Sequence, residues 1–129
     1  MEIEISQNGF MDTQLTKVFK KIGEVDIYTA RNGRKCGIFK LVILWGLFNV
    51  SSMLQETQIM NITVEIRRNN EIIHKFNTDT VGQVSILYTD QLICPNCPIH
   101  YEIFVASNTE DTKLEGTTSF VAEVFNIEC

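Results

Sequence analysis

The sequence predicts an α+β fold in which an antiparallel β-sheet packs against two helices from the N-terminal half of the chain. Three observations lead to this prediction. Residues 37–50 form the longest apolar run, residues 15–22 place apolar side chains at helical spacing, and from residue 59 onward apolar and polar residues alternate with a period of two. A length of 129 residues and a hydrophobic content of 44% are typical of one globular domain, which we assign to residues 1–129.

The first half of the chain is expected to form a short strand and then two helices. Residues 2–6 alternate acidic and apolar side chains, which predicts a strand that ends at the turn signal Asn-Gly. The next element has one apolar stripe at positions i, i+3, i+4 and i+7, typical of a helix, formed by Leu15, Val18, Phe19 and Ile22.

Residues 37–50 are apolar on nearly every side of a helical projection, which favours a helix buried in the core. We expect the only tryptophan, Trp45, to lie inside that core. A buried β-strand explains the same run, because periodicity cannot separate the two, but the length of the run favours a helix.

The second half of the chain predicts antiparallel strands. Residues 59–77 are expected to form a hairpin whose turn lies at 67–70. Further strands are predicted at 81–87, 99–105 and 118–127, where apolar residues recur at every second position.

Charge is unevenly distributed along the chain. The net charge is −5, yet residues 17–40 contain seven basic and two acidic residues, and the chain from residue 99 onward contains one basic and six acidic residues. The basic region can contact phosphate groups of lipid or RNA, and its candidate binding residues are Lys17, Lys20, Lys21, Arg31, Arg34 and Lys35. The same lysines also fit a helix face that is merely solvated.

The segment Cys94-Pro-Asn-Cys97 with nearby His100 has the residue types of a metal site. Two thiolates two residues apart can bind one zinc ion, with the histidine as a third ligand. A structural zinc site needs a fourth ligand, and the candidates are Cys36, Cys129 and His74. Because no second such motif is present, we expect a proline-fixed turn with reduced thiols, no disulfide between Cys94 and Cys97, and no bound metal.

The sequence does not indicate an enzyme or a cofactor. It contains neither a glycine-rich phosphate loop nor a Gly-x-Ser-x-Gly motif, and its two histidines leave few candidates for a general base. The N-terminus alternates acidic and apolar residues and is unlike a secretion signal.

Residues 2–52 resemble the core of rhabdovirus matrix proteins, including those of plant rhabdoviruses. The matching pieces are residues 3–10, 15–22, 31–35 after Tyr28, and 37–52, and the segment 65–68 is similar in type. The resemblance implies a viral structural protein that self-associates, condenses the viral nucleoprotein–RNA complex and contacts an anionic membrane surface. It also implies a location in the virion, in the host cytoplasm and on the inner face of host membranes.

A second class of function is consistent with the same residues. An intracellular β-rich module for protein interaction or host modulation would bind its partner through exposed strand edges. Self-association separates the two classes, because a matrix protein polymerises and a monomeric binding module does not.

Overall fold

A computed structural model describes residues 2–8, 13–27, 39–52, 60–79, 81–92, 99–109 and 111–127. These residues contain no helix, so the predicted α+β fold is wrong and the described part of the protein is all-β. Its strands are β1 (Glu2–Asn8), β2 (Thr13–Gln14), β3 (Lys20–Ile27), β4 (Phe39–Ser52), β5 (Ile62–Arg68), β6 (Glu71–Thr78), β7 (Gly82–Leu92), β8 (Ile99–Ser107) and β9 (Thr112–Ile127). Consequently no helix able to span a bilayer occurs in the described ranges.

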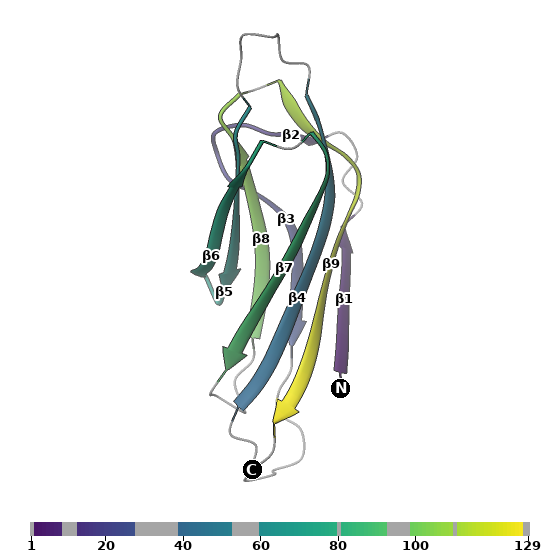
Figure 1. Cartoon of the computed structure of the whole chain (residues 1–129), viewed down its shortest axis with the longest axis vertical. Coiled ribbons are helices and arrows are strands. Elements are labelled where there is room, and N and C mark those ends of the chain that lie inside the picture. Colours follow the sequence, from purple (N-terminus) through teal and green to yellow (C-terminus); the bar gives the residue numbers. More distant parts are fainter. Residues whose placement is uncertain are drawn as a thin grey trace.

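The strands form two antiparallel sheets, one in front of the other (Figure 1). The first sheet has the order β1-β9-β4-β7, and the short β2 also pairs with β9. The second sheet has the order β3-β8-β5-β6. Eight long strands arranged in two four-stranded antiparallel sheets, with the chain passing repeatedly from one sheet to the other, form a jelly roll.

The core lies between the two sheets and is made largely by alternate residues of β3, β4, β5, β7, β8 and β9. Its largest buried side chains come from both sheets and include Phe48, Phe120, Tyr101, Ile66 and Ile103, each exposed by 1% or less. Gly46 lies where the sheets approach closely, because a Cβ added to it would lie 3.1 Å from the Cδ1 atoms of Ile103 and Ile86.

The predicted central helix is instead β4, the strand at the middle of the first sheet. Its even-numbered residues from 42 to 50 are buried, whereas its odd-numbered residues from 41 to 49 are partly buried or exposed. Trp45 is 44% exposed, so the prediction that it lies in the core is also wrong. The run looked helical because both faces of this strand are apolar, which removes the alternation by which strands are recognised.

The predicted helix at residues 15–22 is replaced by a bend and the start of β3. Leu15 and Ile22 are buried, but Val18 is 71% exposed, so the four apolar residues do not form one stripe. The helical spacing of these four residues is therefore a coincidence. Leu15, Val18 and Phe19 precede β3, whereas Ile22 belongs to it.

The strands predicted in the second half are confirmed. β5 and β6 form the expected hairpin, and its turn residues Asn69 and Asn70 have φ values of 48° and 69°. Positive φ at both central positions suits a two-residue hairpin loop, and asparagine tolerates this conformation better than most residues. β8 and β9 cover the strands predicted at 99–105 and 118–127, and β7 overlaps the one predicted at 81–87 but begins one residue later. The strand predicted at residues 2–6 is β1, which extends to Asn8.

Candidate functional site

The outer face of the first sheet carries a row of apolar side chains. Trp45 on β4 pairs with Leu87 on β7 and with Val121 on β9. Trp45 and Leu87 are 44% and 62% exposed. We call this surface the apolar face, formed by Leu41, Ile43, Trp45, Leu47, Leu87, Val121 and Phe125.

Charge is scarce on the apolar face. At the outward positions of β4, β7 and β9 that lie level with residues 41–47, the single charged side chain is Glu123. The outer face of an antiparallel sheet in a monomeric sandwich is normally polar, because it contacts water. An exposed apolar area that crosses several strands is typical of a protein–protein interface.

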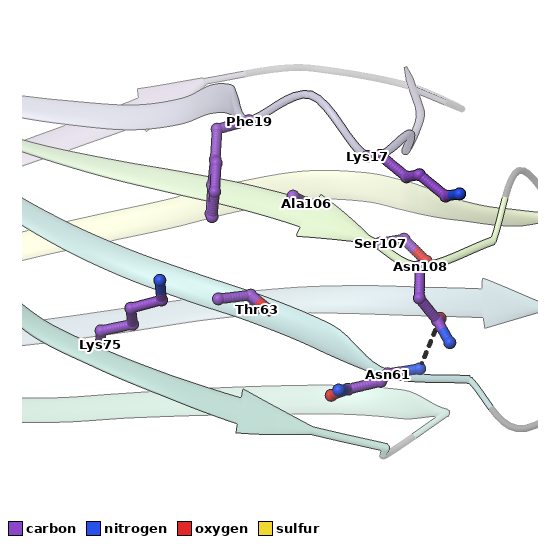
Figure 2. A pocket seen from close by; sticks show the side chains of 8 residues that line it. All are labelled: Lys17, Phe19, Asn61, Thr63, Lys75, Ala106, Ser107 and Asn108. Carbon is purple, nitrogen blue, oxygen red and sulfur yellow. Dashed lines mark hydrogen bonds between the residues drawn. The ribbon is translucent and has the colours of Figure 1, made fainter.

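The second sheet carries a pocket of about 300 Å³ near the start of β5 and the end of β8 (Figure 2). Lys75 and Phe19 lie at one end of it and Lys17 at the other. Asn61 and Asn108 fix one wall, because the backbone N–H of Asn61 donates to Asn108 Oδ1 at 2.7 Å and that of Asn108 donates to the Asn61 carbonyl at 3.0 Å. The residues lining the pocket include two lysines and no carboxylate. Lys75 Nζ lies 3.6 Å from Glu65 Oε2, so Lys17 is the lysine of this pocket better placed to receive an anionic group.

The predicted basic residues do not form one helical face. Lys17 lines the pocket and has no carboxylate of the described residues within 4.0 Å. Lys20 Nζ donates to the Gln14 carbonyl at 2.7 Å, whereas Lys21 Nζ pairs with Glu24 at 2.8 Å. Lys20 and Lys21 are neighbours on a strand, so they point to opposite faces of the sheet. The three other predicted residues, Arg31, Arg34 and Lys35, lie outside the described residues.

His100 lies on the outer face of the second sheet, among acidic side chains. Its Nδ1 hydrogen-bonds Asp26, and its Nε2 faces Glu24 and Glu102 at 3.4 and 3.6 Å. Partial burial alone would lower the pKa of His100. The hydrogen bond to Asp26 and the charges of all three carboxylates outweigh that effect, so the pKa is raised above its usual value of 6.5.

The other predicted metal ligands are not brought to His100 within the described residues. Cys94, Cys97, Cys36 and Cys129 lie outside the described ranges. His74 stacks on Tyr88 with ring centroids 4.6 Å apart, where β6 meets β7. Sequence reasoning identified His100 but missed Glu24 and Glu102. Glu24 is 76 residues away and has no local signal, whereas Glu102 follows His100 by two residues, a spacing that places both side chains on one face of a strand.

Neither a protein-family model nor a curated protein matches this sequence. Solved structures of similar shape include broad bean stain virus (TM-score 0.43, 8% identity, 97% of this chain and 88% of that chain) and rabbit GITRL (TM-score 0.42, 12% identity, 95% and 93%). A third is the CBM36-1 domain of a multidomain xylanase from the hindgut metagenome of Trinervitermes trinervoides (TM-score 0.43, 11% identity, 93% and 96%). Virus particles are thus among the structures that this chain resembles in shape, and the comparisons assign it to no family.

Proposed function

We propose that this chain is a non-catalytic structural protein that assembles with copies of itself through the apolar face. The observation that carries the proposal is the outward row of Trp45, Leu87 and Val121, which joins three neighbouring strands of one sheet. A row of this kind is self-complementary, so a second copy can cover it with the same residues.

The apolar face has the size of the centre of such a contact. Residues 41–47 of β4 span roughly 20 Å, and three strands are roughly 14 Å wide, which gives a projected area of about 300 Å². Each partner of a standard interface buries about 800 Å² of accessible surface. The apolar face therefore supplies the apolar centre of a contact, and the polar rim around it supplies the remaining area.

Assembly should depend on the apolar face and resist salt. We expect the parent protein to form oligomers in sedimentation velocity experiments, and Trp45→Glu or Leu87→Glu to shift it to monomers. Each substitution would bury an unpaired charge at the contact. Emission of the only tryptophan should shift to shorter wavelength as the parent associates, because water leaves the Trp45 ring.

Ile72→Glu is the matched control, because Ile72 is 50% exposed on β6 of the other sheet. It should leave the oligomer unchanged. A parent that stays monomeric at all concentrations, or an oligomer that persists in both Trp45→Glu and Leu87→Glu, contradicts the proposal. Assembly that weakens steeply with salt would instead indicate contacts between exposed charges, which salt screens.

A matrix-type role in a virion is the finer form of this proposal, and it adds contact with anionic lipid or RNA. The resemblance of residues 2–52 to rhabdovirus matrix proteins stays a prediction, although the helices on which it rested are absent from the described residues. Support for anionic contact comes from the pocket between Lys17 and Lys75. An interaction module for a different protein is the alternative, and the same apolar face would serve it.

Reversing both pocket lysines tests the finer proposal. The double variant Lys17→Glu, Lys75→Glu should bind vesicles containing anionic lipid more weakly than the parent does, since each basic residue near such a surface contributes about 1 kcal/mol. Vesicle co-sedimentation measures this, and each single reversal, Lys17→Glu or Lys75→Glu, is compared with Lys113→Glu on β9 as a control of equal charge change. Single-stranded RNA binding gives a second readout. Equal binding by the parent and the double variant would remove the support for a matrix role.

A further inference from the structure

Three side chains that can bind a metal ion meet on the outer face of the second sheet, from β3 and β8. His100 Nε2 lies 3.4 Å from Glu24 Oε2 and 3.6 Å from Glu102 Oε2, and the three ligand atoms lie within 4.8 Å of one another. Zinc bonds of about 2.0–2.1 Å place two ligands of a tetrahedral site roughly 3.3 to 3.4 Å apart. We propose that Glu24, His100 and Glu102 bind a divalent transition-metal ion.

Neighbouring groups hold His100 in the orientation that this site needs. Asp26 takes the Nδ1 position, which leaves Nε2 directed at the two glutamates. A carboxylate on the second ring nitrogen is the usual outer partner of a metal-binding histidine, because it fixes the tautomer and the ring orientation. The backbone of His100 is fixed as well, since its N–H donates to Asn69 Oδ1 at 2.8 Å and its carbonyl accepts from Asn69 at 2.9 Å.

The Glu102 carboxylate makes only two long ion pairs among the described residues. Its side chain is only 10% exposed, and the nearest cationic groups of the described residues are Lys21 Nζ and His100 Nε2, both 3.6 Å away. Lys21 lies closer to Glu24, at 2.8 Å, and its side chain is 44% exposed. The Lys21 ammonium is therefore an exposed counter-ion that a metal ion can displace, and a displaced lysine can reach water without crossing the core.

The donor set indicates the class of ion. One imidazole nitrogen and two carboxylate oxygens suit zinc and its first-row neighbours, whereas magnesium and calcium prefer oxygen ligands alone. Three protein ligands leave a fourth position open for water or for a group from another molecule. The site is independent of the apolar face, which belongs to the other sheet.

Zinc titration of the untagged full chain tests the proposal. We expect one zinc ion per chain by isothermal titration calorimetry and no uptake of magnesium. Binding should be lost in His100→Ala and in Glu102→Gln. Asp26→Asn should weaken it about 10- to 100-fold, the usual effect of removing an outer partner. Lys21→Ala should tighten it about two- to fivefold, because a competing exposed ion pair is gone.

Two control variants separate this site from the other candidates. His74→Ala and the double variant Cys94→Ser, Cys97→Ser should both bind zinc as the parent does. Zinc lost from the cysteine variant but kept by Glu102→Gln would assign the ion to the thiols and overturn the proposal. So would a Lys21→Ala protein that is folded by circular dichroism and takes up no zinc at millimolar concentration. Because Lys21→Ala removes only an exposed side chain, this second test does not depend on a core substitution.

Discussion

Asp90→Ala should lower the free energy of unfolding by about 2–4 kcal/mol, because it leaves the partly buried Arg68 and the fully buried Tyr101 without an acceptor. Asp90 lies on β7 of the first sheet and is 7% exposed. Arg68 Nη1 donates to both of its carboxylate oxygens at 2.8 Å, and the hydroxyl of Tyr101 donates to Oδ2 at 2.7 Å. Arg68 and Tyr101 belong to the second sheet, so this carboxylate joins the two layers.

The protonation states of the partners strengthen this contact. Burial and the hydrogen bond to Asp90 raise the pKa of Tyr101 far above its usual range, so the hydroxyl keeps its proton and remains a donor. The hydrogen bond to Asp90 also raises the pKa of Arg68. Removing the carboxylate therefore leaves the Arg68 guanidinium without its counter-ion and the buried Tyr101 hydroxyl without its acceptor. Losing both contacts costs more stability than losing one exposed ion pair.

Chemical denaturation of matched variants measures the effect. Tyr101→Phe removes one donor and leaves the Arg68 contact intact, so its cost should be about 1 kcal/mol. Arg68→Met in the Asp90→Ala background should recover part of the lost stability, because no unpaired charge remains. If Asp90→Ala cost no more than Tyr101→Phe, the carboxylate would not be the centre of this contact.

Strand prediction succeeded where one face of a strand is apolar and the other is polar. β5 is an example, because its buried Ile62, Val64 and Ile66 alternate with the polar residues Thr63, Glu65 and Arg67. Glu65 is itself buried and pairs with Arg67 at 2.7 Å. Alternation of this kind follows directly from the pleat of a strand. The hairpin turn was predictable for a related reason, since the two asparagines adopt the backbone conformation that such a loop requires.

Prediction failed for β4 because its outward face is not polar. The burial of residues 42, 44, 46, 48 and 50 makes the core, and the apolar odd-numbered residues make the apolar face. A strand with one apolar face in the core and a second apolar face at an interface lacks the alternation of apolar and polar residues by which strands are recognised. The feature that hid the fold is thus the same feature that supports the proposed function.

Functional side chains were predictable only in part. Lys17 and His100 were both identified from composition and spacing, and each lies in a chemically distinct place. The residues that complete each site come from distant parts of the sequence. Lys75 on β6 lines the same pocket as Lys17, and the pairing of β3 with β8 places Glu24 near His100. Strand pairing at this separation depends on the whole fold, which a single sequence does not specify locally.

Phe48→Ala should cost about 3–5 kcal/mol, the usual range for a buried aromatic residue cut to alanine. Phe48 is 1% exposed and lies on the inward face of β4 opposite Val84. Trp45→Ala should cost only about 1 kcal/mol in the monomer, because Trp45 points outward and is 44% exposed. The two residues are three positions apart, so on a helix they would share a face, whereas on a strand they lie on opposite faces.

The pair of substitutions therefore separates a helix from a strand at residues 39–52 without a new structure. The stability cost of each substitution should be measured by denaturation in a Leu87→Glu background, which keeps the chain monomeric. In a monomer, Trp45 makes no contact with a second copy, so the loss of that contact does not contribute to the measured cost. Large costs of similar size at both positions would support the helix, and a large cost at Phe48 alone supports the strand. In the associating parent, Trp45→Ala should acquire an additional, concentration-dependent cost that Phe48→Ala does not share, because mass action links assembly to folding and only Trp45 lies on the apolar face.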